Sequence, residues 1–356
     1  MVDFLVSRAD LRQCRFDTPA EAKLEPGQIL LGIDKFALTS NNITYAVFGD
    51  AMSYWNFFPG PQGWGRVPVW GFADVLQSRH DGVAEGERVY GYLPMSTHLV
   101  VQPDRVADGT FMDGVAHRRP LPTPYQRYQN VSRLPGYDKA TEDFHPLLVP
   151  LYATSFLIDD FLSDNDLFGA RSVILSSASS KTAIGVAFLL KRFRRSEVIG
   201  LTSKGNLAFC EKLGCYDRVV TYDQIASLDA KTPSVFVDMA GDGKVLHDVH
   251  HHFRDALKYS CIVGAAHWEN RETQHALPGP KPQFFFAPNQ IKKRTQDWGP
   301  GGVDQHFAQV WQPFVDFVQP WMKIKHSRGE SAVQEIYLRM LEGKVPADEG
   351  HMLSLQ

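Results

Sequence analysis

The sequence predicts an α/β protein in which a β-rich part precedes a doubly wound parallel sheet. Residues 28–103 hold short alternating runs separated by turns that contain glycine or proline, which is typical of antiparallel strands. From residue 147 to about 290, apolar β-branched runs alternate with segments of helical spacing, the pattern of βαβ units. The chain has 356 residues, 44% of them hydrophobic, which is enough for two domains.

The expected domain borders follow from this change in the pattern of apolar residues along the sequence. We expect a β-rich substrate and catalytic domain at 1–153, a nucleotide-binding domain at 154–300, and C-terminal helices at 301–356 that return to the first domain. Strands are expected at 28–38, 67–78, 87–92 and 97–103. Residues 303–342 show helical spacing, which Pro313 and Pro320 must kink or interrupt.

Residues 104–146 are expected to form an irregular excursion from the first domain. Three prolines within five residues exclude a helix or a central strand at its centre, because proline cannot donate a backbone hydrogen bond. A segment of this length without regular structure is often functional. We therefore expect Tyr125, Arg127 and Tyr128 to cover a bound substrate.

Composition narrows the class of protein. A net charge of −3 gives no basic face for nucleic acid, and no apolar run is long enough to cross a membrane. The charged N-terminus lacks the apolar core of a signal peptide, so we expect a cytoplasmic protein. The four cysteines are scattered, which favours free thiols over a zinc site: Cys14, Cys210, Cys215 and Cys261.

The most informative stretch is SVILSSASSKTAIGVAFLL, residues 172–190. It predicts a buried strand, a tight turn of small residues and a helix, the arrangement that places a diphosphate at a helix N-terminus. We expect the turn and the first helical residues to bind it: Ser177, Ala178, Ser179, Ser180, Lys181 and Thr182. The glycines common in such turns are missing, so hydroxyl groups are expected to donate to the phosphates instead.

The carboxyl ends of the other predicted strands should complete the site, because ligands of doubly wound sheets lie there. These ends contribute Ala240, Gly264 and Ala265. The end of the second strand selects the cofactor, since an acidic residue binds a free ribose hydroxyl and a cation accommodates a 2′-phosphate. It carries Thr202, Ser203, Lys204 and Asn206, with no acidic residue before Glu211, which favours NADPH over NADH.

Four segments in order resemble a known family: LEPGQILLGIDKFALTSNNITYAVFG, VPVWGFADVLQSRHDGVAEGERVYGY, LLVPLYATSFLIDDFL and EGKVPADEGHMLSL. The chain is similar to a medium-chain dehydrogenase/reductase (MDR) of the zinc-free quinone oxidoreductase type, in particular to the DUF2855 family. The resemblance implies a GroES-like domain, a Rossmann domain and a homodimer paired through the sheet of the cofactor domain. Residues 261–268 are expected to form the pairing edge.

The sequence departs from this family pattern at two places. Ser177, Ser180 and Ala183 stand where relatives usually have glycines in the phosphate turn. Zinc-dependent relatives would have a cysteine near Ser40, which this chain lacks, so no metal is expected. His247 and His251 are four residues apart on a predicted helix, but no cysteine or carboxylate completes a ligand set, and we interpret the cluster as surface.

Without zinc, hydride transfer needs a proton donor or a polarising hydrogen bond from side chains. The resemblance implies that Asn42 faces the nicotinamide. Tyr45, three residues on, is the first candidate for the proton donor and Tyr54 the second, although both could serve only as packing groups. Thr154 is expected near the amide end of the cofactor, or to be an ordinary helix residue.

Aromatic residues are dense at 45–70, and Phe284, Phe285 and Phe286 are expected to line the same site, with Phe286 also touching the cofactor. An apolar or aromatic substrate follows. The expected activity is the NADPH-dependent reduction of an enone, a quinone or a ketone. Two alternatives remain: a protein that binds NADPH without turnover, as a sensor or structural protein, and a non-redox lyase on the same scaffold.

Overall fold

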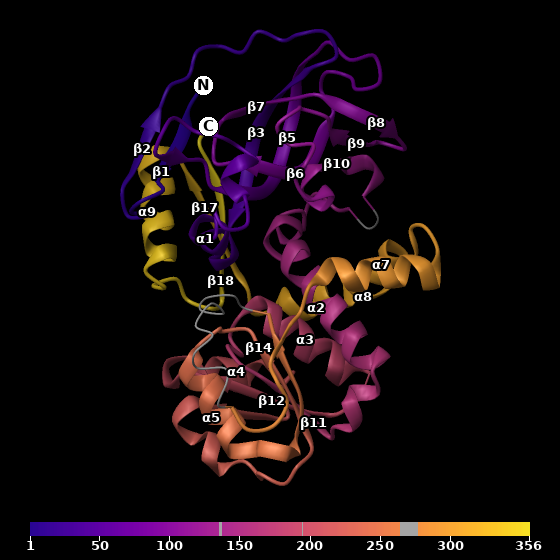
Figure 1. Ribbon diagram of the computed structural model, residues 1–356. Coiled ribbons are helices and arrows are strands. Elements are labelled where there is room, and N and C mark those ends of the chain that lie inside the picture. Colours follow the sequence, from indigo (N-terminus) through magenta and orange to yellow (C-terminus); the bar gives the residue numbers. More distant parts are fainter. Residues whose placement is uncertain (135–136, 194, 264–276) are drawn as a thin grey trace. The chain divides into compact units, whose positions relative to one another are not determined.

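The computed structural model describes residues 1–134, 137–193, 195–263 and 277–356 (Figure 1). The chain forms two compact units: unit 1 comprises Met1–Pro150 and Met322–Gln356, and unit 2 comprises Leu151–Trp321. The sequence placed these borders after residues 153 and 300. The second differs most, because helix α8 (Gly302–Val318) belongs to unit 2 rather than to the C-terminal segment.

A nine-stranded sheet dominates the described part of unit 1, in the order β17-β18-β3-β5-β6-β10-β9-β8, with β7 paired to β3. The strands predicted from the N-terminal third are present as β3 (Ile29–Leu38), β5 (Pro68–Ser78), β6 (Arg88–Pro94) and β7 (His98–Val101). A separate three-stranded sheet contains β1 (Asp3–Ser7), β2 (Cys14–Asp17) and β4 (Trp64–Gly65). The main core of unit 1 lies against these strands and includes Phe4, Phe36 and Tyr92.

The expectation of an irregular excursion at 104–146 is wrong as far as residue 130. This part contains β8 (Pro103–Ala107), β9 (Thr110–Asp113) and β10 (Arg127–Asn130), and β10 pairs with β6 inside the large sheet. The prolines are tolerated because they precede or begin the 3₁₀ helix η2 (Thr123–Gln126), where a missing N–H costs nothing. Tyr128 is buried and donates a 2.6 Å hydrogen bond to the Tyr92 carbonyl, so it is a core residue and not part of a cover.

The C-terminal residues return to unit 1, because β18 (Glu349–Ser354) pairs antiparallel with β3 and parallel with β17 (Lys323–Arg328). The sequence extended a helix through residues 323–325, which the structure shows as part of β17. Helix α8 ends at Val318, just before Pro320, while Pro313 lies inside it. The helices of unit 1 also include α1 (Ser40–Val47), α9 (Glu330–Leu341), η1 (Tyr54–Asn56) and η3 (Val131–Arg133).

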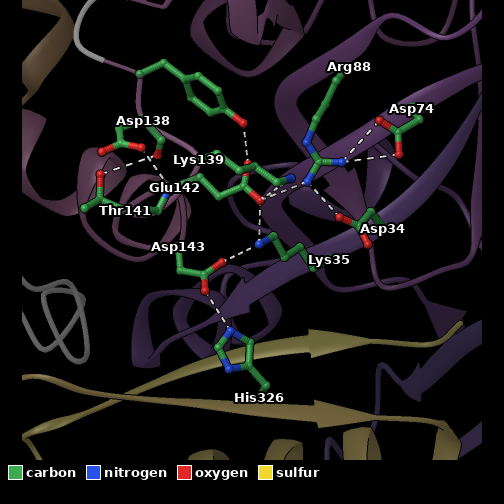
Figure 2. A network of polar contacts seen from close by, with 12 residues as sticks. Asp34, Lys35, Asp74, Arg88, Asp138, Lys139, Thr141, Glu142, Asp143 and His326 are labelled. Atoms are coloured by element: carbon green, nitrogen blue, oxygen red, sulfur yellow. Dashed lines mark hydrogen bonds and ion pairs between the residues drawn. The ribbon is translucent and has the colours of Figure 1, made fainter.

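A polar network ties the segment before helix α2 (Phe144–Asp164) to the sheet of unit 1 (Figure 2). Glu142, whose side chain is 2% exposed, accepts contacts from Lys35 on β3 at 2.7 Å and from Arg88 on β6 at 3.2 Å. Asp143 bridges Lys35 at 2.6 Å and His326 on β17 at 2.7 Å. The network therefore connects three strands to the start of α2.

Unit 2 contains, among its described residues, a six-stranded parallel sheet in the order β13-β12-β11-β14-β15-β16. Numbered along the chain, this is the order 3-2-1-4-5-6 of dinucleotide-binding folds. The strands are β11 (Ser172–Leu175), β12 (Glu197–Thr202), β13 (Arg218–Thr221), β14 (Ser234–Asp238), β15 (Leu257–Ile262) and β16 (Gln283–Phe284). Val173, Ile174 and Leu175 are all fully buried, so both faces of the central strand are covered.

The described part of unit 2 also contains helices. They are α3 (Lys181–Arg192), α4 (Leu207–Leu213), α5 (Gly243–Phe253), α7 (Ala287–Trp298), α8, η4 (Asp166–Gly169), η5 (Lys204–Asn206), η6 (Tyr222–Ser227) and η7 (Arg254–Ala256). A Cβ on Gly185 would lie 2.5 Å from Ser155 Oγ, so glycine is required where α3 meets α2. Tyr152 of α2 stacks on Phe314 of α8 with ring centroids 3.8 Å apart.

Two expectations about the end of this sheet need correction. The expected edge segment starts at residue 261, whereas the strand it belongs to, β15, begins at Leu257, because α5 ends at Phe253. Residues 261–268 were expected to form the sheet edge; residues 264–268 lie outside the described residues, and Cys261 and Ile262 on β15 pair with β16, so β15 is not the outer strand. In the part of the chain that the structure describes, no helix is both long and apolar enough to cross a membrane.

Candidate cofactor site and tyrosine cluster

The turn between β11 and α3, where the sequence predicts phosphate binding, contains no glycine but includes a left-handed residue. Ser177 takes a left-handed conformation, with φ at +47°, a region that favours glycine. Its N–H donates to the Tyr222 hydroxyl at 3.0 Å, and its carbonyl accepts the Ser180 N–H at 2.7 Å. The serine thus adopts a backbone conformation that glycine takes at lower cost.

The close approach between this turn and β12 depends on a glycine in the neighbouring strand. Ala178 is fully buried, and its N–H donates to the Leu201 carbonyl at 2.9 Å. Its own carbonyl accepts the Tyr216 hydroxyl at 2.7 Å. A Cβ on Gly200 would lie only 2.8 Å from the Ala178 Cβ, so Gly200 provides the space that a glycine in the turn would otherwise provide.

Helix α3 presents its N-terminus at the end of the turn. Ser180 is the N-cap, and its side chain accepts the Ala183 N–H at 3.2 Å. Lys181 and Thr182 are the first two helical residues, at the end of the helix that carries partial positive charge. Ser179 Oγ accepts a 3.0 Å hydrogen bond from Asn206 Nδ2, which ties the turn to the segment after β12. This arrangement suits a diphosphate.

The ends of β11 and β14, where the strand order reverses, are joined by a buried pair. Ser176 Oγ donates to Asp238 Oδ1 at 2.6 Å and accepts the N–H groups of Met239 and Ala240 at 2.8 and 3.1 Å. Burial raises the pKa of Asp238. Ala240, predicted from the sequence as a cofactor residue, therefore has its N–H engaged in this connection.

The ends of β12 and β13 bring together a cation and an acid. Lys204 Nζ lies 2.9 Å from Asp223 Oδ2, and Thr221 donates to Asp223 Oδ1 at 2.6 Å. Thr202 is buried at the end of β12, and Ser203 precedes η5. Along the sequence, Glu211 is the first acidic residue after Thr202, so the sequence analysis did not identify Asp223 or its neighbour Tyr222. Both residues follow the strand after β12, and the ends of neighbouring parallel strands lie side by side, so this position could have pointed to them.

The remaining predicted cofactor residues lie elsewhere in unit 2 or cannot be placed. Thr154 is half-buried on α2, and Phe286 precedes α7 with 49% of its surface exposed. Phe284 on β16 is equally exposed, whereas Phe285 contacts Phe161 with ring centroids 5.6 Å apart. Gly264 and Ala265 lie outside the described residues.

In unit 1, Asn42 fixes the start of α1. Its Oδ1 accepts the Thr39 N–H at 2.7 Å and the Thr39 hydroxyl at 3.0 Å. Its Nδ2 donates to the Pro68 carbonyl on β5 at 2.9 Å. These contacts anchor the helix to the sheet and set the position of Tyr45 one turn later. That Asn42 faces a nicotinamide stays a prediction.

Tyr45 belongs to a cluster of tyrosines in the core of unit 1, the tyrosine cluster: Tyr45, Tyr54, Tyr92 and Tyr125. Tyr45 lies 4.5 Å from Tyr54 and 5.7 Å from Tyr92 between ring centroids, and Tyr92 lies 4.8 Å from Tyr125. The hydroxyls of Tyr54 and Tyr125 are 3.4 Å apart. Among the described residues the buried Tyr92 hydroxyl has no hydrogen-bond partner. The sequence singled out only the first two members, since Tyr125 was assigned to a cover and Tyr92 to a strand.

Burial controls the protonation of this cluster. It raises the pKa of Tyr45 well above the usual value, and it raises the pKa of Tyr54 to about 12. Because the tyrosine hydroxyls lie close together, a negative charge on one of them would also disfavour ionisation of its neighbours. The phenols therefore remain protonated near neutral pH and can act as hydrogen-bond donors to an oxygen atom.

Two of the histidines on α5 stack on each other, and a third is buried and makes hydrogen-bond contacts. His247 and His251 stack with ring centroids 3.8 Å apart, as their four-residue spacing predicts. His250 is buried and contacts Ser260 Oγ and the Pro278 carbonyl, each at 2.9 Å. Within the described residues there is no group of three or more His, Cys, Asp or Glu side chains that could hold a metal ion.

Solved structures with the same fold include several oxidoreductases. The yhdH oxidoreductase from Salmonella enterica in complex with NADP is 14% identical, with a TM-score of 0.56 and coverage of 100% of both chains. CurA from Vibrio vulnificus in complex with NADPH is 12% identical, with a TM-score of 0.60 over 100% of this chain and 99% of that one. The quinone oxidoreductase from Coxiella burnetii is 12% identical, with a TM-score of 0.58 and the same coverage.

These likenesses show the fold: a β-rich domain and a Rossmann-type domain with a parallel sheet. No curated protein matches the chain. The sequence model of one family, described as "Protein of unknown function (DUF2855)", matches residues 36–346. Because this match spans most of the chain, the protein belongs to the DUF2855 family.

Proposed function

We propose that the protein is an NADPH-dependent, metal-independent oxidoreductase that reduces an apolar or aromatic enone, quinone or ketone. The observation that carries the proposal is the β11–α3 turn, where left-handed Ser177, the glycine at position 200 and the capped N-terminus of α3 occur together. Each of these features serves a separate requirement of diphosphate binding. The NADP and NADPH complexes among the solved structures of this fold support the same cofactor.

The cofactor would be held by unit 2. The N-terminus of α3, with the turn residue Ser179 and the Lys181 ammonium, would bind the diphosphate. Lys204, with the hydroxyl of Ser203 and the amide of Asn206, would bind the 2′-phosphate. Bound NADPH supplies the hydride.

The proton would come from the tyrosine cluster of unit 1. We assign the donor role to Tyr45, with Tyr54 as the second candidate, because their raised pKa values keep the hydroxyls protonated. A hydroxyl donating to the substrate oxygen stabilises the negative charge that develops there as hydride arrives. Asn42 would act as a positioning residue, since it holds the helix that carries Tyr45.

The test begins with binding and continues with turnover. Purified protein is titrated with NADPH and NADH by calorimetry, and NADPH oxidation is followed with a panel of enones, quinones and ketones. The proposal requires measurable heat with a pyridine nucleotide and oxidation with at least one of these compounds. Bound NADPH that no compound oxidises would indicate a binding protein instead, and substrate loss without NADPH oxidation would indicate a lyase.

The proton-donor assignment needs its own variant and a matched control. Tyr45→Phe should lower kcat on the active compound by about 10²-fold or more, the usual contribution of a general acid. Tyr337→Phe removes another buried hydroxyl of unit 1, one that donates to the Leu11 carbonyl, and should leave kcat unchanged. Unchanged turnover in Tyr45→Phe would exclude Tyr45 as the acid.

We also propose that two copies pair through the edge of the unit 2 sheet. Strand β16 is the outer strand in the described part of this sheet, and Phe284 on it is 49% exposed. An exposed apolar side chain on an unpaired edge favours association with a second strand. Light scattering should give a dimer mass for the wild type and a monomer mass for Phe284→Asp. A monomeric wild type would contradict the pairing.

A further inference from the structure

Lys204 and Asp223 occupy equivalent positions on two neighbouring parallel strands. Thr202 on β12 and Thr221 on β13 are partners in the register, and each charged residue follows two positions after its threonine. The side chains meet in an ion pair of 2.9 Å. The register of the strands thus places a carboxylate beside the cation that the proposed function assigns to the 2′-phosphate.

Asp223 is held in this position by its surroundings. Thr221 Oγ1 donates to its Oδ1 at 2.6 Å, which leaves Oδ2 to face Lys204. The Thr221 hydroxyl and the Lys204 ammonium lower the pKa of Asp223, so the carboxylate is charged at neutral pH. The preceding residue, Tyr222, accepts the Ser177 N–H at 3.0 Å, so the segment that carries Asp223 also contacts the phosphate turn.

Stability does not account for this ion pair. The side chains of Lys204 and Asp223 are 78% and 56% exposed, and pairs this accessible to water contribute little to folding. Both remain accessible to a ligand at the carboxyl ends of the strands. Their effect on a charged ligand is therefore larger than their effect on the fold.

The two side chains act in opposite directions on a 2′-phosphate. A phosphomonoester carries a charge of about −1.5 to −2 at neutral pH, so Lys204 attracts it and Asp223 repels it. An unphosphorylated ribose presents hydroxyls, for which a carboxylate is a good acceptor. The same pair thus favours NADH through one side chain and NADPH through the other.

We infer that Asp223 is a specificity-determining residue that lowers the preference of the site for 2′-phosphorylated nucleotides, so that the protein binds both NADPH and NADH. This inference rests on the proposed function, because it concerns the same cofactor site. It predicts a small difference in affinity between the two nucleotides in the wild type. It also predicts that the difference grows when the carboxylate is removed.

The experiment uses fragments that lack the nicotinamide, so the result does not depend on turnover. The wild type and Asp223→Asn are titrated by calorimetry with 2′,5′-ADP and with 5′-AMP. The variant should bind 2′,5′-ADP about tenfold more tightly, the effect of a carboxylate roughly 5 Å from a doubly charged phosphate in water. Affinity for 5′-AMP should stay the same or fall, and the gain should shrink at high salt.

Two further variants separate a local effect from a change in net charge. Asp229→Asn removes an exposed carboxylate of the same unit, one bonded to Thr232 and to the Lys231 N–H, and should leave both affinities unchanged. Lys204→Gln combined with Asp223→Asn should abolish the gain for 2′,5′-ADP, because the attracting charge is gone.

The outcomes distinguish this inference from the proposed function. Equal changes in Asp223→Asn and Asp229→Asn would overturn the inference alone, as would binding of 2′,5′-ADP by Asp223→Asn with wild-type affinity. If neither nucleotide fragment nor either intact cofactor binds any of these proteins, the proposed function fails and the inference fails with it.

Discussion

Ser176 and Asp238 join the two central strands of unit 2 at the point where their order reverses. The Asp238 carboxylate, almost fully buried, accepts the Ser176 hydroxyl at 2.6 Å and the N–H groups of Ala240 and Gly241 at 3.1 and 3.2 Å. The Ser176 hydroxyl in turn accepts two backbone N–H groups. This connection shapes the end of β14 independently of any ligand.

Ser176→Ala should lower the free energy of unfolding of unit 2 by about 2 kcal/mol, because it removes a donor to a buried carboxylate and an acceptor for two N–H groups. Urea unfolding followed by far-UV circular dichroism measures the change. Ser227→Ala, at an exposed position in η6, is the control and should alter stability by less than about 0.5 kcal/mol. A loss no larger than that of the control would contradict the proposed connection.

A half-buried histidine should make unit 1 sensitive to acid. The His145 ring packs edge-on against Tyr90 with centroids 4.8 Å apart, and burial lowers the pKa of His145 to about 4. The unfolded chain, with a histidine pKa near 6.5, binds more protons over this interval, so stability is lost as the pH falls from about 6.5 to 4. The loss from this group is about 3 kcal/mol.

Hydrogen exchange of the β5 and β6 amides at several pH values measures this sensitivity in unit 1. His145→Gln should give a smaller decrease in protection between pH 6.5 and 4 than the wild type. The comparison uses the slope, so a change in overall stability of the variant does not affect it. Parallel slopes would show that another group is responsible.

The polar network of Figure 2 offers a comparison between a buried and an exposed partner of one arginine. Arg88 contacts Glu142, with a side chain 2% exposed, and Asp74, with a side chain 43% exposed. Glu142→Gln should lower the free energy of unfolding by about 3 kcal/mol, because it leaves the charges of Lys35 and Arg88 without their buried counterion. Asp74→Asn should cost less than about 1 kcal/mol.

Thermal or urea unfolding of the two variants tests this difference. The pKa of Glu142 is lowered to about 2, by its contacts with Lys139, Lys35 and Tyr137, against the cost of burial. Its stabilising effect is therefore present above the usual carboxyl pKa and is lost as the pH falls toward 2. Equal losses in the two variants at neutral pH would mean that burial of the carboxylate is unimportant here.

The central strands of the parallel sheet could be predicted from the sequence because they are buried on both faces. The run at 172–175 is continuously apolar, and β11 has the predicted bounds. Strands such as β10 and β17 gave no such signal. Arg127–Asn130 and Lys323–Arg328 are polar, and only their pairing with β6 and β18 makes them strands.

The residues of the candidate site also differ in how far the sequence could predict them. The turn proposed to bind phosphate is local, so the strand, the turn and the helix that contain Ser177, Ser180 and Lys181 could be predicted from consecutive residues. Asp223 reaches Lys204 only because β13 lies beside β12, and Tyr125 reaches Tyr92 only because η2 packs against β6. Such contacts depend on the order of strands, which spacing along one chain does not specify.

The last prediction concerns the serine that replaces glycine in the turn. Ser177 has φ at +47°, and a left-handed conformation costs an ordinary residue roughly 1–2 kcal/mol. Glycine removes this cost but loses more chain entropy on folding, about 0.5–1 kcal/mol. The first effect is larger, so Ser177→Gly should stabilise unit 2 by about 0.5–1 kcal/mol.

Ser180→Ala provides the contrast within the same turn. It removes the N-cap acceptor of the Ala183 N–H and should destabilise unit 2 by about 1 kcal/mol. Thermal unfolding of both variants gives the two signs, and NADPH titration should show that Ser177→Gly keeps its affinity, since the backbone path of the turn is unchanged. A destabilised Ser177→Gly would mean that the serine side chain, rather than the left-handed backbone, maintains the turn.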